Sequence, residues 1–380
     1  MKKRIISVLL CTAMIATMLV GCGGTKESAE TTGEESKAAT EQEGKVTEAP
    51  AQAKATEEAS GEAQETAGTF NPDTETDTVA YADLEANYGP LSDLSLPEGV
   101  TLGSILKNQA NEFWLMLGEG MTEAAKANGT TIDIQATRTE TDTAGQLSIA
   151  ETMIQNNYNA LILSPLTNEC LDTAVATAKA AGIPIVNANC EYIADCDTFV
   201  GGLQIEIGQK AADYIANKIG GAGKVAILEG VAGTFTSIQR VNGFKQQLEA
   251  KYPDIEIVAS VPADYETEKG LNVATDILTQ NPDVAALYCC NDNMALGAVE
   301  ALRARNMLGK VIVLGVDGTG DAYKSIKAGE LTATVDQFPA ENGKAAVEVA
   351  LRLLAGQKLP KVVSTPIEVI DKDNAGQYGK

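Results

Sequence analysis

The chain has 380 residues, of which 44% are hydrophobic and 21% are charged, and its formal net charge is −23. The length fits two domains of ordinary size. The acidic balance argues against nucleic-acid binding, because phosphate contacts need clustered Lys and Arg. The sequence contains no histidine, which removes the commonest general base and the commonest metal ligand. We therefore expect no catalytic residues, no metal site and no cofactor.

Residues 1–21 have the pattern of a secretion signal. A basic start at positions 2–4 precedes an apolar run at 5–20. The run ends in Leu-Val-Gly-Cys at 19–22, which resembles the bacterial lipobox. That resemblance implies cleavage before Cys22 and lipid on its sulfur, which predicts an extracytoplasmic protein anchored to the cell membrane. The alternative is an uncleaved membrane anchor, since the apolar run is just long enough to span a bilayer.

Two segments of different composition follow the signal. Residues 22–70 are rich in Ala, Thr, Glu, Gln, Ser and Lys and contain almost no large apolar residue. Such a segment cannot bury a core, so we predict a disordered and extended acidic tether. Residues 71–99 form an N-terminal extension that contains several leucines and tyrosines. These side chains either dock on the folded part or stay loose, and the sequence leaves both open.

A regular alternation of strands and helices begins near residue 100. Short apolar runs predict strands, and apolar residues three and four positions apart predict helices. The predicted strands of this first run are 100–106, 132–135, 160–165, 182–186 and 198–201. The predicted helices are 111–128, 144–156 and 171–181.

The alternation restarts after a predicted helix at 208–219 and a glycine-rich break at 220–223. The predicted strands of this second run are 224–228, 256–261, 284–289, 311–316 and 331–335, and residues 362–370 form an extended tail. The predicted helices are 237–251, 268–280, 293–305, 321–328 and 342–354. Two such runs predict an α/β fold with two doubly wound parallel-sheet lobes. The carboxyl-end edges of the two sheets would face each other across a cleft.

The stretch from Ala286 to Gly297 predicts the end of a buried strand, a polar turn and the first turn of a helix. Asn291 and Asp292 form the turn, and either can cap the helix. In an open α/β sheet, ligands bind at this kind of corner. We predict that Asn291 points into the cleft and holds a small polar molecule. The alternative is that both residues only complete the turn and cap the helix.

Several groups of residues occur together in an order and spacing more specific than any one of them. They are Gly230–Thr234, Pro262–Tyr265 with Lys269–Val273, Asn291–Ala298 and Gly315–Thr319. Together they resemble the type I periplasmic sugar-binding proteins, close to the ribose-binding branch, and the resemblance runs from about Thr101 to about Ile370.

The resemblance implies a monomer of two lobes, each completed by a segment returned from the other half of the chain. Lobe 1 would be 100–203 with 338–363, and lobe 2 would be 204–337 with 364–380. The resemblance also implies closure about a three-strand hinge and delivery of the captive ligand to an ABC permease.

The family's ligand-contacting pattern can be carried over position by position. It implies ligand contacts at Asn111, Phe113, Trp114, Asn189, Tyr265, Asn291, Asp317 and Gln337. These side-chain types suit a sugar or polyol. The C–H faces of a pyranose stack on aromatic rings, at about 1–3 kcal/mol by analogy with nucleic-acid bases. A carboxylate accepts from neighbouring hydroxyls through charge-assisted bonds, and amides donate and accept at once.

Some positions depart from the family pattern. Asn189-Cys190 stands where the sugar binders often show an Asp-Arg pair, and Ile238 stands where they show an arginine. Arg240, two residues further on, is a candidate ligand-binding residue, as is Lys107, which replaces a small polar residue. With two forked donors lost, another aldose, an inositol or another polyol is as good a candidate as ribose.

Each candidate residue also has a purely structural alternative. Phe113 and Trp114 can be core residues at the start of a helix. Asp317 can be a turn residue before a glycine, Tyr265 a surface aromatic, and Gln337 only part of the hinge.

The cysteines that follow Cys22 suggest one covalent link. Cys190 and Cys196 are close enough in sequence to close a small loop beside the cleft, and the export route permits disulfides. We state this disulfide as a hypothesis, with free thiols as the alternative. Cys289 and Cys290 lie at a strand end and are expected to be small buried hydrophobic residues. The glycine-rich residues 220–224 lack the spacing of a phosphate loop and precede a strand.

The favoured function is a lipid-tethered binding protein that passes a sugar or polyol to a permease. A second hypothesis is a sensor that presents the same closed form to a membrane receptor. An enzyme on this scaffold is disfavoured by the lack of histidine and of a phosphate loop. A transcription repressor with a related ligand domain would need a basic helix-turn-helix in place of the signal and tether.

Overall fold

The computed structural model describes residues 70–378, and its strands form one seven-stranded and one six-stranded sheet. We call the parts built on these sheets lobe 1 and lobe 2. Cys22, the predicted signal and the predicted tether lie outside the described residues. Among residues 70–378, no helix combines the length and the apolar character that a membrane span requires.

In lobe 1 the strand order is β1-β12-β6-β5-β4-β2-β3, and every neighbouring pair is parallel. The strands are β1 (Thr78–Ala80), β2 (Thr101–Leu106), β3 (Thr131–Ala136), β4 (Ala160–Leu163), β5 (Ile185–Ala188), β6 (Thr198–Gly201) and β12 (Val362–Ser364). The α-helices are α1 (Leu84–Tyr88), α2 (Glu112–Ala127), α3 (Thr143–Gln155), α4 (Asp172–Ala180) and α10 (Pro339–Leu354). Two 3₁₀ turns, Tyr81–Asp83 and Leu91–Asp93, flank α1.

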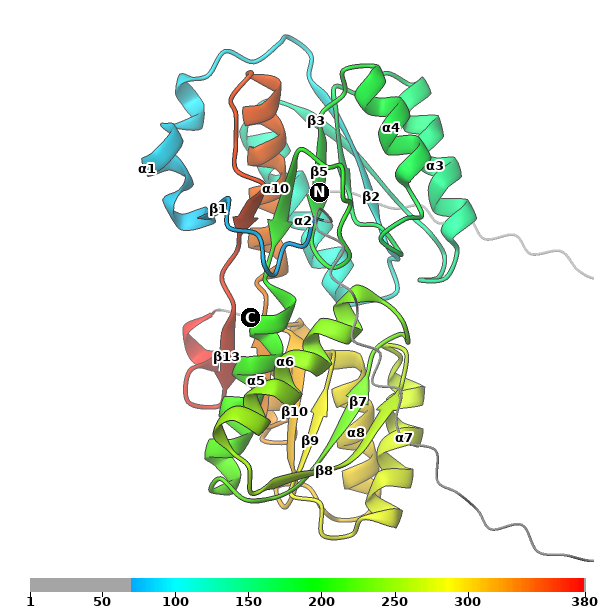
Figure 1. The fold of residues 1–380 in the computed structure, drawn as a ribbon, viewed down its shortest axis with the longest axis vertical. Helices are drawn as coiled ribbons and strands as arrows, with labels where there is room; N and C mark the ends of the chain where they lie inside the picture. Colours follow the sequence, from blue (N-terminus) through cyan, green and yellow to red (C-terminus); the bar gives the residue numbers. More distant parts are fainter. Residues whose placement is uncertain (1–69, 379–380) are drawn as a thin grey trace, which may run out of the picture. The chain divides into compact units, whose positions relative to one another are not determined.

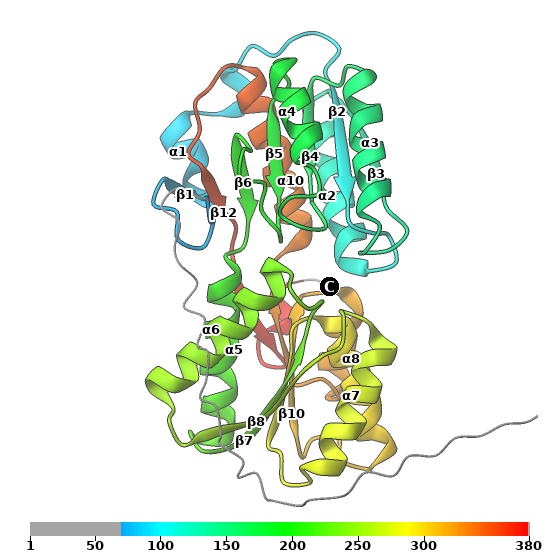
Figure 2. The ribbon, with the colours of Figure 1, turned by 45° about the vertical axis from the view of Figure 1, so that its right-hand side comes forward.

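The lobe 1 sheet buries both of its faces, as a parallel sheet requires. Successive residues of a strand alternate between the two faces. Leu106 packs in a core with α2 and α10, whereas its neighbour Ile105 packs in a second core with α3 and α4. Figure 2 shows α3 and α4 as a pair beside this sheet, with α10 on the other side. The fully apolar run of β4 follows from this two-sided burial.

In lobe 2 the strand order is β13-β11-β10-β9-β7-β8. The strands are β7 (Gly223–Glu229), β8 (Ile255–Pro262), β9 (Ala286–Cys289), β10 (Ile312–Asp317), β11 (Ala333–Asp336) and β13 (Glu368–Asp371). The helices are α5 (Gln204–Ile219), α6 (Phe235–Lys251), α7 (Thr267–Gln280), α8 (Asp292–Ala304), α9 (Gly320–Ala328) and the 3₁₀ turn Ala375–Gln377. Figure 1 shows α5 with α6 on one side of the sheet and α7 with α8 on the other.

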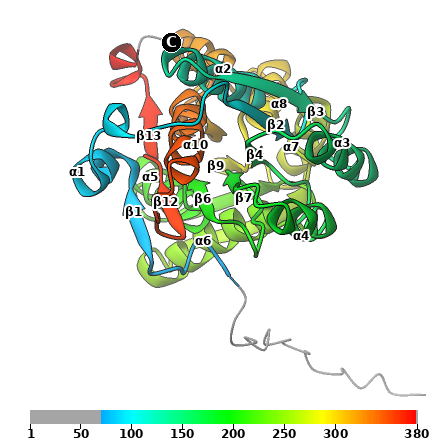
Figure 3. The ribbon, with the colours of Figure 1, turned by 90° about the horizontal axis from the view of Figure 1, so that it is seen from above.

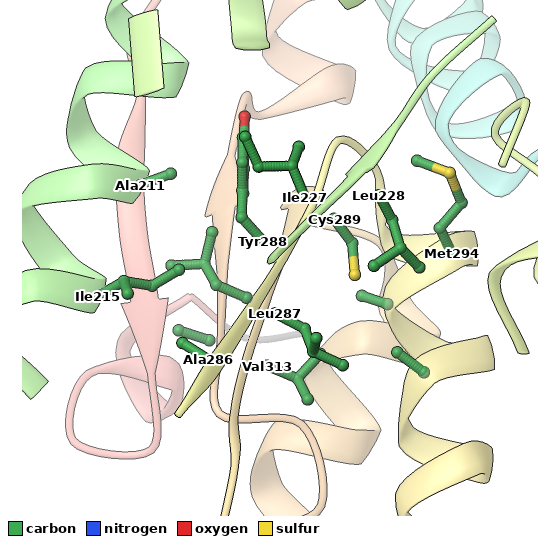
Figure 4. Close-up of a cluster of buried hydrophobic side chains, with 14 of the residues drawn as sticks. Ala211, Ile215, Ile227, Leu228, Ala286, Leu287, Tyr288, Cys289, Met294 and Val313 are labelled. Atoms are coloured by element: carbon green, nitrogen blue, oxygen red, sulfur yellow. The ribbon is translucent and has the colours of Figure 1, made fainter. Parts of the chain in front are cut away.

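Strand β9 lies in the middle of the lobe 2 core. Figure 4 shows its residues between Ala211 and Ile215 of α5 and Met294 of α8. The ring of Tyr288 stacks on Phe244 with centroids 4.6 Å apart. Because β9 is central and buried on both faces, the turn that follows it is held rigidly.

The chain passes between the two sheets at three places. It leaves lobe 1 after β6, returns between β11 and α10, and leaves again between β12 and β13. From residue 100 on, strands and helices alternate in two runs as predicted, and the two-sheet α/β architecture is confirmed. The tail differs from the parallel-sheet prediction in one respect, because β13 runs antiparallel to β11.

Helix α5 begins at Gln204, four residues before its predicted start. The prediction took Gly208 as a boundary. Gly208 instead lies inside the helix and allows α6 to approach closely, since a Cβ at Gly208 would collide with the carbonyl oxygen of Arg240 on α6. The Asp73 carboxylate accepts hydrogen bonds from the amides of Gln204 (2.7 Å) and Ile205 (3.2 Å), which caps the helix from outside its own sequence.

The N-terminal extension docks on lobe 1, which decides between the two alternatives that the sequence left open. Strand β1 pairs in parallel with β12 and so adds the last strand to the sheet; Figure 3 shows β12 lying between β1 and β6. Leu84 is fully buried in the lobe 1 core. Arg352 of α10 donates to the Gly89 carbonyl (2.9 Å), which fixes the far end of the segment.

Candidate functional site

A small cavity is lined by residues of both lobes, and we call it the inner cavity. Its volume is about 20 Å³, which is room for about one water molecule. A monosaccharide is larger than this, so the surrounding groups must move apart to admit one. The lining residues are Lys107, Asn111, Phe113, Trp114, Glu140, Cys190, Thr236, Arg240, Tyr265, Asn291 and Asp317.

Two aromatic rings from the start of α2 form the lobe 1 wall. Phe113 and Trp114 pack edge to face with centroids 4.9 Å apart, and each is 2% exposed. Asn111 caps the helix by accepting from the Phe113 amide at 3.1 Å. Both rings also belong to the lobe 1 core. The structural and the ligand-binding interpretations of these rings are therefore compatible.

Arg240 lies on the lobe 2 side of the inner cavity, and its side chain is buried. Its Nε donates to Gln204 Oε1 at 2.9 Å, and Nη1 donates to the Cys290 carbonyl. Ile238, at the position taken for the family arginine, is 44% exposed. A forked donor is therefore present at the cavity, two residues beyond the position of the family arginine.

Asp317, the last residue of β10, faces Arg240 and is almost fully buried. Its Oδ1 lies 3.7 Å from Arg240 Nη1 and accepts from Gln337 Nε2 at 3.0 Å. Burial raises the pKa of Asp317 well above its usual value, and Arg240 opposes that shift. The carboxylate is thus held by a cation and an amide at the wall of the cavity.

Asn291 caps a helix and also lies at the inner cavity, so the two placements that the sequence suggested occur together. Its Oδ1 accepts from the Met294 amide (2.9 Å) and caps α8, while its side chain also lines the inner cavity. Asp292 has a structural role instead. It accepts from the amides of Gly318 and Thr319, each at 2.9 Å, and from Thr334 Oγ1 at 2.7 Å. Burial raises the pKa of Asp292 to about 7.

Tyr265 is not a surface aromatic, since its hydroxyl is buried beside the inner cavity. The hydroxyl has no hydrogen-bond partner within the described part of the chain, and the same holds for the buried Thr236 Oγ1. Unpaired buried hydroxyls are costly. Both groups are therefore positioned to pair with a polar guest.

Asn189 and Gln337 lie behind the inner cavity and do not line it. Asn189 Nδ2 donates to Gln337 Oε1 at 3.4 Å, and Asn189 Oδ1 accepts from Gln204 Nε2 at 3.2 Å. Gln337 in turn donates to Asp317. These amides connect two of the interlobe crossings to the cavity wall.

Sequence reasoning missed two residues that line the inner cavity, Glu140 and Thr236, and one beside it, Glu191. Glu140 lines the cavity and accepts from Trp114 Nε1 at 3.2 Å, and Glu191 pairs with the cavity residue Lys107. Glu140 and Glu191 follow the carboxyl ends of β3 and β5, and Thr236 opens α6. Their positions after strands were a usable signal, but nothing local indicates that their side chains turn inward.

The disulfide proposed between Cys190 and Cys196 is not formed, and all five cysteines of the described chain are free. The two sulfurs pack in different cores, Cys190 with the helices α2 and α10 and Cys196 with α3 and α4. Because these cores lie on opposite faces of the lobe 1 sheet, the sulfurs cannot meet. Cys289 and Cys290 are fully buried in the lobe 2 core.

A larger cavity adjoins the inner one and has a volume of about 550 Å³. Asn111, Glu140 and Tyr265 line both cavities. The outer cavity is lined by loops of lobe 1 and by Asp264–Lys269 of lobe 2. Within residues 70–378, no group of three or more metal-binding side chains comes together.

Residues 102–358 match the family model of the periplasmic binding protein domain. The chain belongs to this family. A relative from Escherichia coli, the D-allose-binding periplasmic protein, is 36% identical over 268 residues, which cover 68% of this chain and 85% of the relative. The ribose import binding protein RbsB of Bacillus subtilis is 36% identical over 271 residues, with 71% and 86% coverage.

Solved structures of the family agree with the fold of this binding protein. An ABC transporter solute-binding protein from Actinobacillus succinogenes, with bound D-allose, superposes with a TM-score of 0.71 at 34% identity, covering 73% of this chain and 100% of that one. A solute-binding protein from Bacillus halodurans, with bound myo-inositol, gives a TM-score of 0.68 at 29% identity, with 74% and 98% coverage. The sequence resemblance to this family is therefore confirmed.

Proposed function

We propose that this protein captures a monosaccharide or polyol in the inner cavity and delivers it, chemically unchanged, to an ABC permease. The observation that carries the proposal is the inner cavity itself, in which aromatic rings of lobe 1 meet a carboxylate, a guanidinium and an amide of lobe 2. Rings and hydrogen-bonding groups on opposite walls match the two kinds of surface that a sugar presents.

Each wall has a specific part in binding. Phe113 and Trp114 stack on the C–H face of the ring, while Arg240, Asp317 and Asn291 bond its hydroxyls. The paired Arg240 and Asp317 form charge-assisted bonds, which are about twice as strong as neutral ones. Asn189 and Gln337 orient Asp317 from behind, and their ligand contacts are indirect.

The lobes separate and close around the ligand. The supporting observation is the small volume of the inner cavity, about 20 Å³, which cannot receive a sugar unless its walls part. The three crossings near 202, 337 and 365 form the hinge. They divide the described chain into lobe 1, residues 100–203 with 338–363 and the docked extension 71–99, and lobe 2, residues 204–337 with 364–378.

The relatives narrow the ligand class. The relatives described above are named for D-allose and for ribose. A further relative, from Mycolicibacterium smegmatis, is 30% identical over 260 residues and is named for xylitol. These are all uncharged and rich in hydroxyls. We propose the same class for this chain, an aldose or a polyol.

The protein acts as a monomer tethered to the outer side of the cell membrane. Lipid on Cys22 provides the anchor, and the acidic segment 22–70 provides reach. Mass spectrometry of the membrane-extracted protein tests this part. An acylated Cys22 at the N-terminus is expected, and an intact N-terminal signal would refute the anchor.

Calorimetric titration with D-ribose, D-allose, D-xylose, xylitol and myo-inositol tests the binding function. The chain from residue 22, with Cys22→Ser to keep it in solution, is the sample. Since Trp114 is the one tryptophan of the sequence, its fluorescence should change with the ligand that binds. No heat and no fluorescence change with any of these ligands would reject the proposal.

A further inference from the structure

Lys107 and Glu191 form a buried ion pair at the inner cavity, with side chains 4% and 0% exposed. Lys107 follows the end of β2, and Glu191 lies three residues beyond the end of β5. Both therefore belong to the carboxyl-end edge of the lobe 1 sheet. The ammonium also lies over the Trp114 ring, 5.8 Å from its centroid. The pair is thus next to the ring on which a sugar would stack.

The Glu191 carboxylate neutralises the positive charge of Lys107 on the lobe 1 side of the cavity. The cations that line the inner cavity are Lys107 and Arg240, and the carboxylates that line it are Glu140 and Asp317; Glu191 is paired with Lys107. Arg240 is already matched by Asp317, and within the described chain the ion-pair partner of Lys107 is Glu191. Without the Glu191 charge, Glu140 would be the remaining carboxylate that acts on Lys107, and within the described chain the two form no ion pair. The buried ammonium would then lack a direct anionic partner and would attract an anionic guest.

The neighbouring Cys190 contributes no charge of its own. It stands where the family pattern often has an arginine, and its thiol lines the inner cavity. Burial raises the pKa of this thiol to about 12, so the group is neutral at physiological pH. The cation on the lobe 1 side therefore comes from Lys107, and Glu191 is the group that balances it.

Glu191 is also held from lobe 2. Its Oε1 accepts from the Thr236 amide at 3.3 Å, in the first turn of α6, where the helix dipole favours a carboxylate. Next to this contact, the Tyr192 ring meets Phe235 edge to face with centroids 5.0 Å apart. One oxygen thus faces Lys107 and the other faces lobe 2. The carboxylate is fixed when the lobes meet.

We propose that Glu191 is a specificity-determining residue, which neutralises Lys107 so that the closed site accepts an uncharged hydroxyl-rich ligand and rejects the corresponding acid or phosphate ester. The remaining N–H groups of Lys107 are free to donate to a ligand hydroxyl. A ligand carboxylate or phosphate would have to displace Glu191 or enter beside it, and either arrangement leaves an unpaired buried anion. This inference rests on the proposed function and concerns the charge of the ligand.

The test compares neutral and anionic forms of one sugar in the wild type and in Glu191→Gln. The probes are D-ribose with D-ribose 5-phosphate, D-glucose with D-glucuronate, and D-galactose with D-galacturonate, measured by calorimetry. The wild type should prefer the neutral member of a bound pair at least 100-fold. Glu191→Gln should reduce that ratio at least tenfold, because the freed Lys107 attracts the anion.

The matched control is Glu348→Gln, which removes the partner of the buried Arg352 (2.7 Å) away from the cavity. In Glu348→Gln the ratio of the affinities for the neutral and the anionic sugar should stay within twofold of the wild-type ratio, even if the melting temperature falls. A purely structural role for Glu191 would weaken both forms of the sugar equally, and that result would overturn the inference.

Two further variants keep the test decisive if Glu191→Gln does not fold. Lys107→Gln leaves the carboxylate unbalanced and should strengthen rejection of the anion. The double variant Lys107→Gln with Glu191→Gln should return the ratio toward that of the wild type. A Lys107→Gln ratio equal to that of the wild type, or a double variant that keeps the ratio of Lys107→Gln, would refute the inference. Binding of the neutral sugars with no discrimination against the anions refutes only this inference, whereas no binding of any sugar refutes the proposed function and the inference together.

Discussion

Arg240 and Asp317 form a buried ion pair at the wall of the inner cavity, with Nη1 and Oδ1 3.7 Å apart. At that distance the two groups attract each other without closing a short hydrogen bond. A ligand hydroxyl can therefore donate to one and accept from the other. The pair is pre-formed for a guest of this kind, and its carboxylate can be tested directly.

Asp317→Asn should weaken binding of the cognate sugar at least tenfold. The substitution keeps the shape of the side chain but removes the charge that strengthens the ligand bond, and it leaves Arg240 without its anion. Calorimetry measures the affinity, and thermal melting measures the accompanying loss of stability. Asp321→Asn, at an exposed position on α9, is the control and should leave the affinity unchanged. An unaltered affinity in Asp317→Asn would remove Asp317 from the site.

Trp114→Ala should weaken sugar binding by about 1–3 kcal/mol, the range for stacking on an aromatic ring, whereas Trp114→Phe should retain most of the affinity. Trp114 is also buried in the lobe 1 core, so the alanine variant should melt at a lower temperature. Leu117→Ala, in the same core but not at the cavity, separates the two effects. It should lose stability and keep its affinity. Equal affinity losses in both alanine variants would contradict a stacking role.

Gly120→Ala should destabilise the protein by more than about 2 kcal/mol, through overpacking against backbone. Helices α2 and α10 approach so closely there that a Cβ would collide with the Ala340 carbonyl. Gly118→Ala on the same helix is the matched control, because its nearest neighbour would be a flexible Leu106 methyl at 3.3 Å. The control should be neutral or slightly stabilising, since alanine favours helix. Chemical denaturation compares the two, and similar values would contradict the close approach.

Asp73→Asn should alter how stability depends on pH. Burial raises the pKa of Asp73 to about 6, against the opposing effect of the Gln204 and Ile205 amides. A carboxyl with a raised folded-state pKa contributes stability that is fully present below about pH 4 and is lost as the pH rises through about 6. The cost of Asp73→Asn should therefore be larger at pH 4 than at pH 7, by about 1–2 kcal/mol after solvent screening.

Denaturant unfolding of the wild type and of Asp73→Asn at the two pH values measures this difference. Glu206 raises and Arg240 lowers the pKa of Asp73, and the value of about 6 includes both effects. A cost that is the same at pH 4 and pH 7, or larger at pH 7, would show that the Asp73 carboxyl is not the buried acid described here.

Local signals in the sequence were sufficient for most elements. Asn291 was predicted as a possible helix cap and proves to be the N-cap of α8, and Asn111, the predicted first residue of a helix, proves to be the N-cap of α2. The start of α5 was wrong because Gly208 looked like a boundary, whereas it accommodates the close approach of α6. A glycine that ends a helix and a glycine that allows two helices to approach closely look the same in a sequence. Only the neighbour in space distinguishes them.

The sequence by itself determined two alternating sheets, their helices and the corner at Asn291, because periodicity, caps and strand ends depend on neighbours along the chain. The tertiary structure decided which side chains enter the cavity and which sulfurs can meet. Glu191 contacts Thr236, which lies 45 residues away on the other lobe, and Cys190 and Cys196 fall on opposite faces of one sheet. Successive residues of a strand point to opposite faces, so a shift of one residue reverses the direction of a side chain. Contacts across the cleft depend on how the two lobes are placed against each other, which neighbours along the chain do not specify.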